Sequence, residues 1–153
     1  MTKEDFYNLL ILLNKKIKKN GGVVLGCTSE QINLLEIKYG SLPLYYKLFL
    51  SVMGVELGDF KKGTDISYSE IDDINECTIE LMKDNMIKLP KYIFSFLLHQ
   101  GYSSLFFLDR KDNPDVYCYT EGDVIKKTGL SFSDYILSEV KLYDKCHENI
   151  ASK

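Results

Sequence analysis

The chain has 153 residues, of which 45% are hydrophobic and 27% charged, a balance that predicts one globular domain rather than a disordered segment. Its net charge of −3 provides no general attraction to phosphates or anionic lipid. Arg110 is the single arginine, whereas proteins usually recognise bases and phosphates through arginine side chains. We therefore expect neither direct nucleic-acid binding nor membrane binding.

The four cysteines are widely separated, at positions 27, 77, 118 and 146. Without a C-x-x-C pair or a secretory framework, free buried thiols explain them better than disulfides or a metal site. No apolar run approaches the roughly 20 residues of a membrane span, and the first residues lack the pattern of a signal peptide. We therefore expect a cytoplasmic protein without a cofactor.

The first predicted element is a helix within residues 1–22. Thr2 is suited to cap its start, and the Gly21-Gly22 pair is suited to stop it. Its apolar residues recur at helical spacing: Phe6, Leu9, Leu10, Leu13 and Ile17. The Val23 to Leu25 stretch then predicts a short apolar link or edge strand.

Two helices joined at a tight corner are predicted between Thr28 and Gly54. Thr28 and Gln31 have the spacing of a capping box, and Gly40 would stop the first helix in the left-handed conformation. Pro43 suits the first turn of the second helix, which Gly54 would end. The first helix would bury Ile32, Leu35 and Tyr39, with Leu34 beside them. Glu36 lies in this helix, and we expect it to hydrogen-bond backbone groups around the corner from Gly40 to Pro43.

Residues 55–62 have a loop-like pattern. Ser67 and Glu70 then form a second capping box, which opens a helix with a buried stripe of Ile71, Ile74, Thr78, Leu81 and Met82. The other side of this helix is acidic: Glu70, Asp72, Asp73, Glu76, Glu80 and, at its end, Asp84.

After Leu89-Pro90 the pattern changes to β-strands. Residues 94–98, 105–108 and 116–119 are rich in aromatic and β-branched side chains and are separated by turn residues, which predicts an antiparallel meander. Val124-Ile125 would add a short strand. Ser131 would then cap a last helix, and residues 146–153 are expected to form a frayed tail.

Three segments of the predicted helix pair carry a recognisable pattern. Glu36 to Gly40, Leu42-Pro43 and Tyr46 to Leu50 are similar to an E-x-x-x-G, L-P and Y-x-x-F-L series. The chain resembles the SUKH superfamily, which includes cell-wall assembly regulators of the Smi/Knr type and bacterial immunity proteins. The matching positions, which we expect to be structural, are Glu36, Gly40, Leu42, Pro43, Tyr46, Phe49, Leu50 and Gly54.

The resemblance implies one domain over residues 1–153 with an α+β fold. An antiparallel β-sheet, here of about four to six strands, would be backed by N-terminal and C-terminal helices. It also implies no catalytic activity and, for bacterial members, neutralisation of a toxin domain, often a nuclease. The alternative is an intracellular regulatory scaffold of the Smi/Knr type without a toxin partner. We expect a monomer or a weak dimer.

Two groups of residues are candidates for contacting a partner. The acidic helix side, with Glu70, Asp72, Asp73, Glu76 and Glu80, is either an ordinary solvated surface or a docking surface for a basic toxin. The strand tyrosines Tyr102, Tyr117 and Tyr119 are the second candidates, because tyrosine anchors often carry interface energy. Alternation along a strand would place only some of them outside.

Catalytic and metal sites have weaker support in the sequence. His99 ends a strand and His147 lies in the predicted tail, so neither is suggested as a general base, and a small hydrolase would need a polar pocket that the pattern does not display. Asp109, Asp112 and Asp115 resemble a calcium loop, but Lys111 stands where an oxygen ligand is needed. We interpret that segment as a solvated turn.

Overall fold

A computed structural model describes the backbone of residues 1–151 and the side chains of residues 1–148; residues 152–153, part of the predicted tail, lie outside it. The helices are α1 (Lys3–Lys19), α2 (Ser29–Tyr39), α3 (Leu44–Met53), η1 (a 3-10 turn, Tyr68–Glu70), α4 (Ile71–Asp84) and α5 (Phe132–Ala151). The strands are β1 (Val24–Leu25), β2 (Glu56–Leu57), β3 (Phe94–His99), β4 (Ser103–Phe107), β5 (Asp115–Thr120) and β6 (Lys126–Ser131). The predicted α+β class is confirmed.

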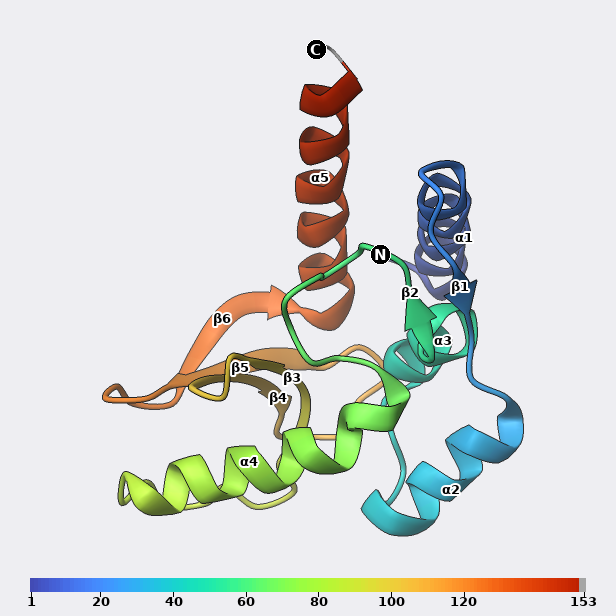
Figure 1. Cartoon of the computed structure of the whole chain (residues 1–153). Coiled ribbons are helices and arrows are strands. Elements are labelled where there is room, and N and C mark those ends of the chain that lie inside the picture. The colour runs from blue at the N-terminus through green and yellow to red at the C-terminus, as the bar shows by residue number, and fades with distance from the viewer. Residues whose placement is uncertain (152–153) are drawn as a thin grey trace.

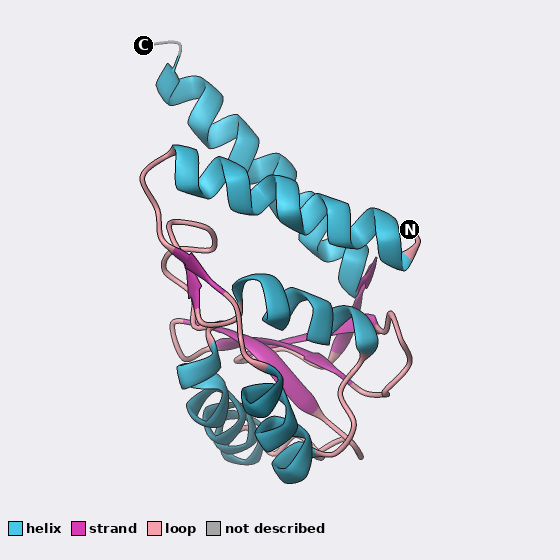
Figure 2. Cartoon of the chain, turned by 90° about the vertical axis from the view of Figure 1, so that its right-hand side faces the viewer, coloured by secondary structure: helices cyan, strands magenta, loops and turns pink. Residues whose placement is uncertain are grey.

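Strands β3 to β6 form a four-stranded antiparallel meander in chain order, and β1 and β2 form a separate antiparallel pair. Figure 1 shows α4 along one face of the meander, and α1, α3 and α5 on the opposite side. In Figure 2 the long helices α1 and α5 lie side by side. Lys16, in the last turn of α1, forms an ion pair with Asp144 of α5, with 2.9 Å between Nζ and Oδ1. Helices therefore cover both faces of the sheet.

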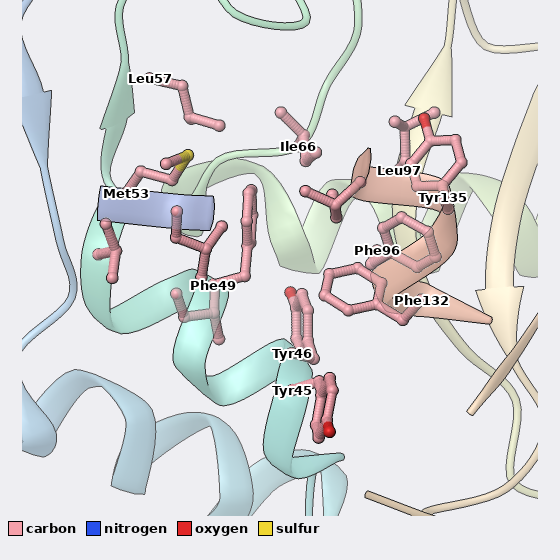
Figure 3. Packing of buried hydrophobic residues seen from close by; sticks show 14 of the residues in the cluster. Tyr45, Tyr46, Phe49, Met53, Leu57, Ile66, Phe96, Leu97, Phe132 and Tyr135 are labelled. Atoms are coloured by element: carbon pink, nitrogen blue, oxygen red, sulfur yellow. The ribbon is translucent and has the colours of Figure 1, made fainter. Parts of the chain in front are cut away.

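The main core lies where α3 meets the sheet and the start of α5. Tyr46 is fully buried, and its ring centroid lies 5.5 Å from that of Phe94, 5.5 Å from Phe107 and 5.7 Å from Phe132. Figure 3 shows Tyr46 on α3 facing Phe132 and Phe96. Edge-to-face aromatic packing of this kind stabilises a core beyond the area it buries. Tyr46, the tyrosine of the Y-x-x-F-L segment, thus joins α3 to β3, β4 and α5.

A second, smaller core fills the space between α4 and the sheet. It is built from the fully buried side chains of Met82, Phe106 and Tyr119, with partly buried apolar residues around them. Because both faces of the sheet are covered, the strands alternate between two cores instead of between a core and solvent.

The predicted helix starts are present. Thr2 Oγ1 accepts a hydrogen bond from the Asp5 N–H at 3.1 Å, and the Thr28–Gln31 capping box is complete, at 3.2 and 2.9 Å. The capping box of Ser67 and Glu70 also forms, but the element that it opens is the short η1 turn. Helix α4 begins directly after η1, at Ile71. Local hydrogen bonding of these side chains thus sets the helix starts.

Two residues at the corner differ from the prediction. Pro43 is the residue before α3, with ψ 139°, so it precedes the first turn and does not belong to it. Gly40 ends α2 with φ 83° and ψ −176°, a positive φ combined with an extended ψ rather than the left-handed helical conformation. That backbone region is essentially restricted to glycine, which explains the residue type equally well.

Three segments of regular structure lie where the sequence did not place them. The loop-like residues 55–62 contain β2, which pairs with β1 through Leu57 and Val24. The last strand is at Lys126–Ser131, after the predicted Val124-Ile125. The final helix continues through Cys146 to Ala151, whereas a frayed tail was expected from residue 146.

Candidate partner-binding surface

Helix α4 has one buried face and one acidic face. Ile71, Ile74, Thr78 and Met82 are buried, three or four residues apart, as packing against a sheet requires. The opposite face exposes the carboxylates of Asp72, Asp73, Glu76, Glu80 and Asp84. The predicted separation of the two faces is therefore present in the structure.

Hydrogen bonds buried beneath α4 hold the helix to β3 and β4. The Asn75 side chain donates to the Ser95 carbonyl at 2.9 Å and accepts from the Ser95 N–H at 2.8 Å. The hydroxyls of Thr78 and Ser104 are 2.9 Å apart, and those of Ser104 and Ser95 are 2.7 Å apart. Sequence reasoning missed Asn75 as an anchor, although an amide beside an apolar stripe is a signal for a buried hydrogen-bonding role. This network fixes which face of α4 lies on the sheet, and therefore which face carries the carboxylates.

The Asp72 carboxylate contacts two side chains of α2. The Tyr39 hydroxyl donates a hydrogen bond to its carboxylate, and Lys38 Nζ lies 2.9 Å from Oδ1. The bond from Tyr39, assisted by Lys38, lowers the pKa of Asp72. Burial and the nearby Asp72 carboxylate raise the pKa of the Tyr39 hydroxyl. The charge of Asp72 is thus partly compensated within the chain.

Glu70 is turned toward its own backbone. Its Oε1 accepts hydrogen bonds from the Ser67 hydroxyl at 2.6 Å, the Ser67 N–H at 3.2 Å and the Ile66 N–H at 3.3 Å. Burial alone would raise the pKa of Glu70, but hydrogen bonds from Ser67 and Asp65 outweigh it and lower the pKa. The neighbouring Asp65 has a raised pKa, chiefly because of its hydrogen bond with Glu70. Glu70 therefore caps the start of the helix, and its carboxylate is engaged there rather than available to a partner.

Four exposed carboxylates remain along α4, and we call the three that lie before its last turn, Asp73, Glu76 and Glu80, the α4 carboxylates. Within residues 1–148, whose side chains are described, no ion pair involves any of them. The exposed Cys77 lies between them, and its thiol pKa is raised by partial burial and by the nearby Glu80, Asp73 and Glu76 carboxylates. Partial burial and the neighbouring carboxylates therefore both disfavour a thiolate at Cys77.

The three candidate tyrosines lie in different environments. Tyr102, in the turn before β4, is 40% exposed. Tyr117 is half-buried, with its ring stacked 6.2 Å from that of Phe106 and the Lys127 ammonium 5.9 Å from its centre. Tyr119 is fully buried beside Met82. Tyr119 cannot contact a partner in this fold, because α4 covers the sheet face on which it lies.

Helix α2 adds exposed apolar side chains that the sequence did not single out as surface residues. Ile37 is 81% exposed and Leu34 is 60% exposed, although Leu34 was expected beside the inner face. Figures 1 and 2 both place α2 next to α4 on the same side of the molecule, where Lys38 and Tyr39 reach Asp72. Exposed apolar residues near fixed charges are typical of a protein interface.

The residues of the E-x-x-x-G and L-P series build the corner. Glu36 Oε2 accepts a hydrogen bond from the Leu42 N–H at 2.9 Å and lies 3.5 Å from Lys47 Nζ. Leu42, Phe49 and Leu50 are buried in the main core. These positions support the fold from inside and offer little to a partner.

Gly54 is required for a close approach. A Cβ atom at this position would lie 2.7 Å from Cys27 Sγ and 2.7 Å from the Leu50 carbonyl oxygen. Its φ of −68° is ordinary, so space rather than backbone conformation selects glycine here.

The two histidines are occupied by structural contacts. His99 packs edge-to-face on Tyr102, with 5.6 Å between ring centres. His147 lies on α5, with one ring nitrogen at the Tyr143 carbonyl and the other at Asp59, each 2.8 Å away. Neither nitrogen of His147 is free to take a proton from a substrate.

Residues 109–114 lie in the connection between β4 and β5, and Asp115 is the first residue of β5. Asp109 Oδ1 accepts the Lys111 N–H at 2.9 Å, and the Asp112 carbonyl accepts the Tyr45 N–H at 2.9 Å. In the described part of the chain no group of three or more His, Cys, Asp or Glu side chains is arranged to hold a metal ion. Nor does any described helix combine the length and apolar character needed to cross a membrane.

Comparison with known proteins adds one finding. A family model described as SMI1 / KNR4 family (SUKH-1) matches residues 26–138. The match runs from the residue before Cys27 into α5, and so includes the corner, α4 and the whole meander. No curated protein and no solved structure is significantly similar to the chain.

Proposed function

The chain belongs to the SMI1/KNR4 family (SUKH-1), and from this premise we propose that it is a non-catalytic immunity protein that binds and neutralises a bacterial toxin domain. The family comprises regulators of the Smi/Knr type and toxin-immunity proteins, so binding to another protein is the activity its members share. We further propose that the toxin is a nuclease with a basic substrate-binding surface.

The observation that carries this proposal is the row of α4 carboxylates. Asp73, Glu76 and Glu80 are exposed and three or four residues apart, so they line one stripe of the helix over about 10 Å. A nuclease binds phosphates with Lys and Arg side chains. A stripe of carboxylates is complementary to such a surface and repels acidic proteins, which favours the correct partner.

The rigidity of α4 supports the same assignment. The helix that carries the carboxylates needs little reordering on binding, because Asn75 and Thr78 fix its backbone to the sheet from the other side. A preorganised surface loses less conformational entropy when it binds. Neutralisation would then be stoichiometric, with the acidic helix lying over the surface that the toxin needs for its substrate.

Apolar contacts would supply the remaining affinity. The exposed Ile37 and Leu34 lie on α2, next to the start of α4, and Tyr102 and Tyr117 are partly accessible. Charges at the rim of an interface mainly speed association, whereas buried apolar anchors slow dissociation. Substitution of Ile37 and of Glu76 should therefore affect different rate constants.

Co-expression tests the proposal directly. The chain is produced together with each toxin domain encoded in neighbouring genes, and growth, complex formation and stoichiometry are measured. We expect relief of toxicity and an equimolar complex with one of them. If none binds and none is neutralised, the immunity role is wrong. Specific binding to a host regulatory protein would instead favour the alternative scaffold function.

A further inference from the structure

A hydrogen-bonded cluster joins α5 to residues 58–66, the segment between β2 and η1 that we call the strap. The Tyr143 hydroxyl donates to Asp59 Oδ1 at 2.8 Å, and His147 Nε2 lies 2.8 Å from Asp59 Oδ2. The Asn20 side chain, at the end of α1, donates to the Tyr143 hydroxyl at 3.0 Å. Three parts of the chain that are far apart in sequence therefore meet at this cluster.

The two nitrogens of His147 both face hydrogen-bond acceptors. Nδ1 lies 2.8 Å from the Tyr143 carbonyl oxygen, and Nε2 faces the Asp59 carboxylate. A neutral imidazole carries one N–H and can satisfy one of these acceptors, whereas the imidazolium donates to both. The geometry therefore fits the doubly protonated ring.

The surroundings stabilise the charged forms of both partners. The pKa of His147 is raised, first by its bond to the Tyr143 carbonyl and then by Asp59. Burial acts to raise the pKa of Asp59, but hydrogen bonds from Tyr143 and His147 outweigh it, and the pKa is lowered. The Tyr143 and His147 rings also pack closely, with 3.9 Å between their centres.

Other charged groups face His147 from the three packed elements. They are Lys61 and Lys62 on the strap, Lys16 and Lys19 at the end of α1, and Asp144 and Glu148 on α5. Lys16 is paired with Asp144 at 2.9 Å, and Lys61 with Glu139 at 3.2 Å, so two of the lysines are compensated by other carboxylates. Asp59 is the carboxylate that contacts the imidazole itself.

We propose that His147 is a pH-dependent contact between the C-terminal part of α5 and the strap: as an imidazolium it forms an ion pair with Asp59, and this attachment weakens when the ring loses a proton. The Lys61–Glu139 pair and the Tyr143–Asp59 bond do not require the His147 proton and stay in place. The weakening is therefore confined to the helical turns after Tyr143.

The direction of the pH effect follows from the two shifts. Because folding raises the pKa of His147, its contribution is complete below the unfolded value of about 6.5 and is lost as the pH rises through the folded value. At the acid end Asp59 acts in the opposite sense. Its contribution is present above about pH 4 and is lost as the pH falls through its lowered folded pKa.

An NMR titration of the imidazole rings tests the inference on the unmodified protein. With nitrogen-15-labelled histidine, the His147 signal, identified by its absence in His147→Gln, should show both nitrogens protonated at about pH 6 and should titrate above 6.5. Each unit by which the pKa is raised corresponds to about tenfold stronger attachment of the protonated form. A His147 signal that titrates at or below 6.5 would overturn the proposal.

Amide hydrogen exchange then measures how readily the C-terminal part of α5 opens. Between about pH 6 and about pH 8.5, protection factors of residues 144–148 should fall in the wild type, and they should be low at both values in His147→Gln. Asp59→Asn should lower the His147 pKa clearly more than the control Asp144→Asn, which removes a nearby charge of the same sign but no contact to the ring. Equal pH dependence in wild type and His147→Gln, or equal effects of the two Asp substitutions, would contradict the assignment.

Discussion

Glu36 and Leu42 are joined by a hydrogen bond of 2.9 Å, in which the backbone N–H of Leu42 donates to the Glu36 carboxylate. The bond spans the corner between α2 and α3, where Gly40 ends one helix and Pro43 leads into the next. Leu42 is buried, so its N–H has little access to water. An acidic residue at this position is thus explained by the backbone group that it satisfies.

Replacing Glu36 by Ala should lower the free energy of unfolding by about 1–3 kcal/mol, because the buried Leu42 N–H would lose its acceptor. Glu36→Gln retains an acceptor oxygen and should cost less than the alanine variant. Urea unfolding of the two variants measures the difference. Equal losses would show that charge, through Lys47 at 3.5 Å, matters more than the bond to Leu42.

Gly54→Ala should destabilise the protein by about 1–3 kcal/mol, because the added Cβ would crowd Cys27 Sγ and the Leu50 carbonyl. Cys27→Ala removes one of the two crowded atoms, and so the double variant should be more stable than the sum of the single effects predicts. Chemical denaturation of the four proteins completes this cycle. Strict additivity would mean that the Cys27 contact does not select glycine.

Asn75→Ala should lower the free energy of unfolding by about 2–4 kcal/mol, since it leaves both the N–H and the carbonyl of Ser95 without their partner beneath α4. The matched control is Cys77→Ala, two residues along the same helix but exposed, which should change stability by less than about 0.5 kcal/mol. Denaturant unfolding measures both. A loss for Asn75→Ala no larger than the control's would show that the buried network does not anchor α4.

The parts of the fold that sequence predicted well depend on local interactions. The caps at Thr2 and Thr28 act within three residues, and the apolar stripe of α4 repeats within one helix. Such patterns can be recognised without knowing the rest of the structure. The final strand was misplaced because Lys126 and Lys127 do not look like a buried strand; they lie on the edge strand β6, where lysine discourages further pairing.

The parts that sequence could not predict depend on distant contacts. Tyr119 and Tyr117 alternate with residues facing the main core, but α4 covers their own face as well, so alternation could not say that Tyr119 would be fully buried. The helical end of α5 also depends on a distant contact, because His147 bonds with Asp59, 88 positions earlier in the chain. Exposure of Ile37 likewise follows from how α2 packs and not from its composition.

We propose that the α4 carboxylates bind a basic toxin surface, and the substitution Glu76→Lys tests this claim. Glu148→Lys is the matched control, because it makes the same charge reversal near the C-terminal end of α5. Figure 1 shows that this end of α5 lies far from α4. Affinity and association rate for the neutralised toxin are measured for both variants and the wild type from about 0.05 to about 0.5 M salt. We expect Glu76→Lys to weaken binding by at least about tenfold at low salt, mainly through slower association, and by less at high salt. Weakening by both variants to the same degree, or by neither, would contradict the claim.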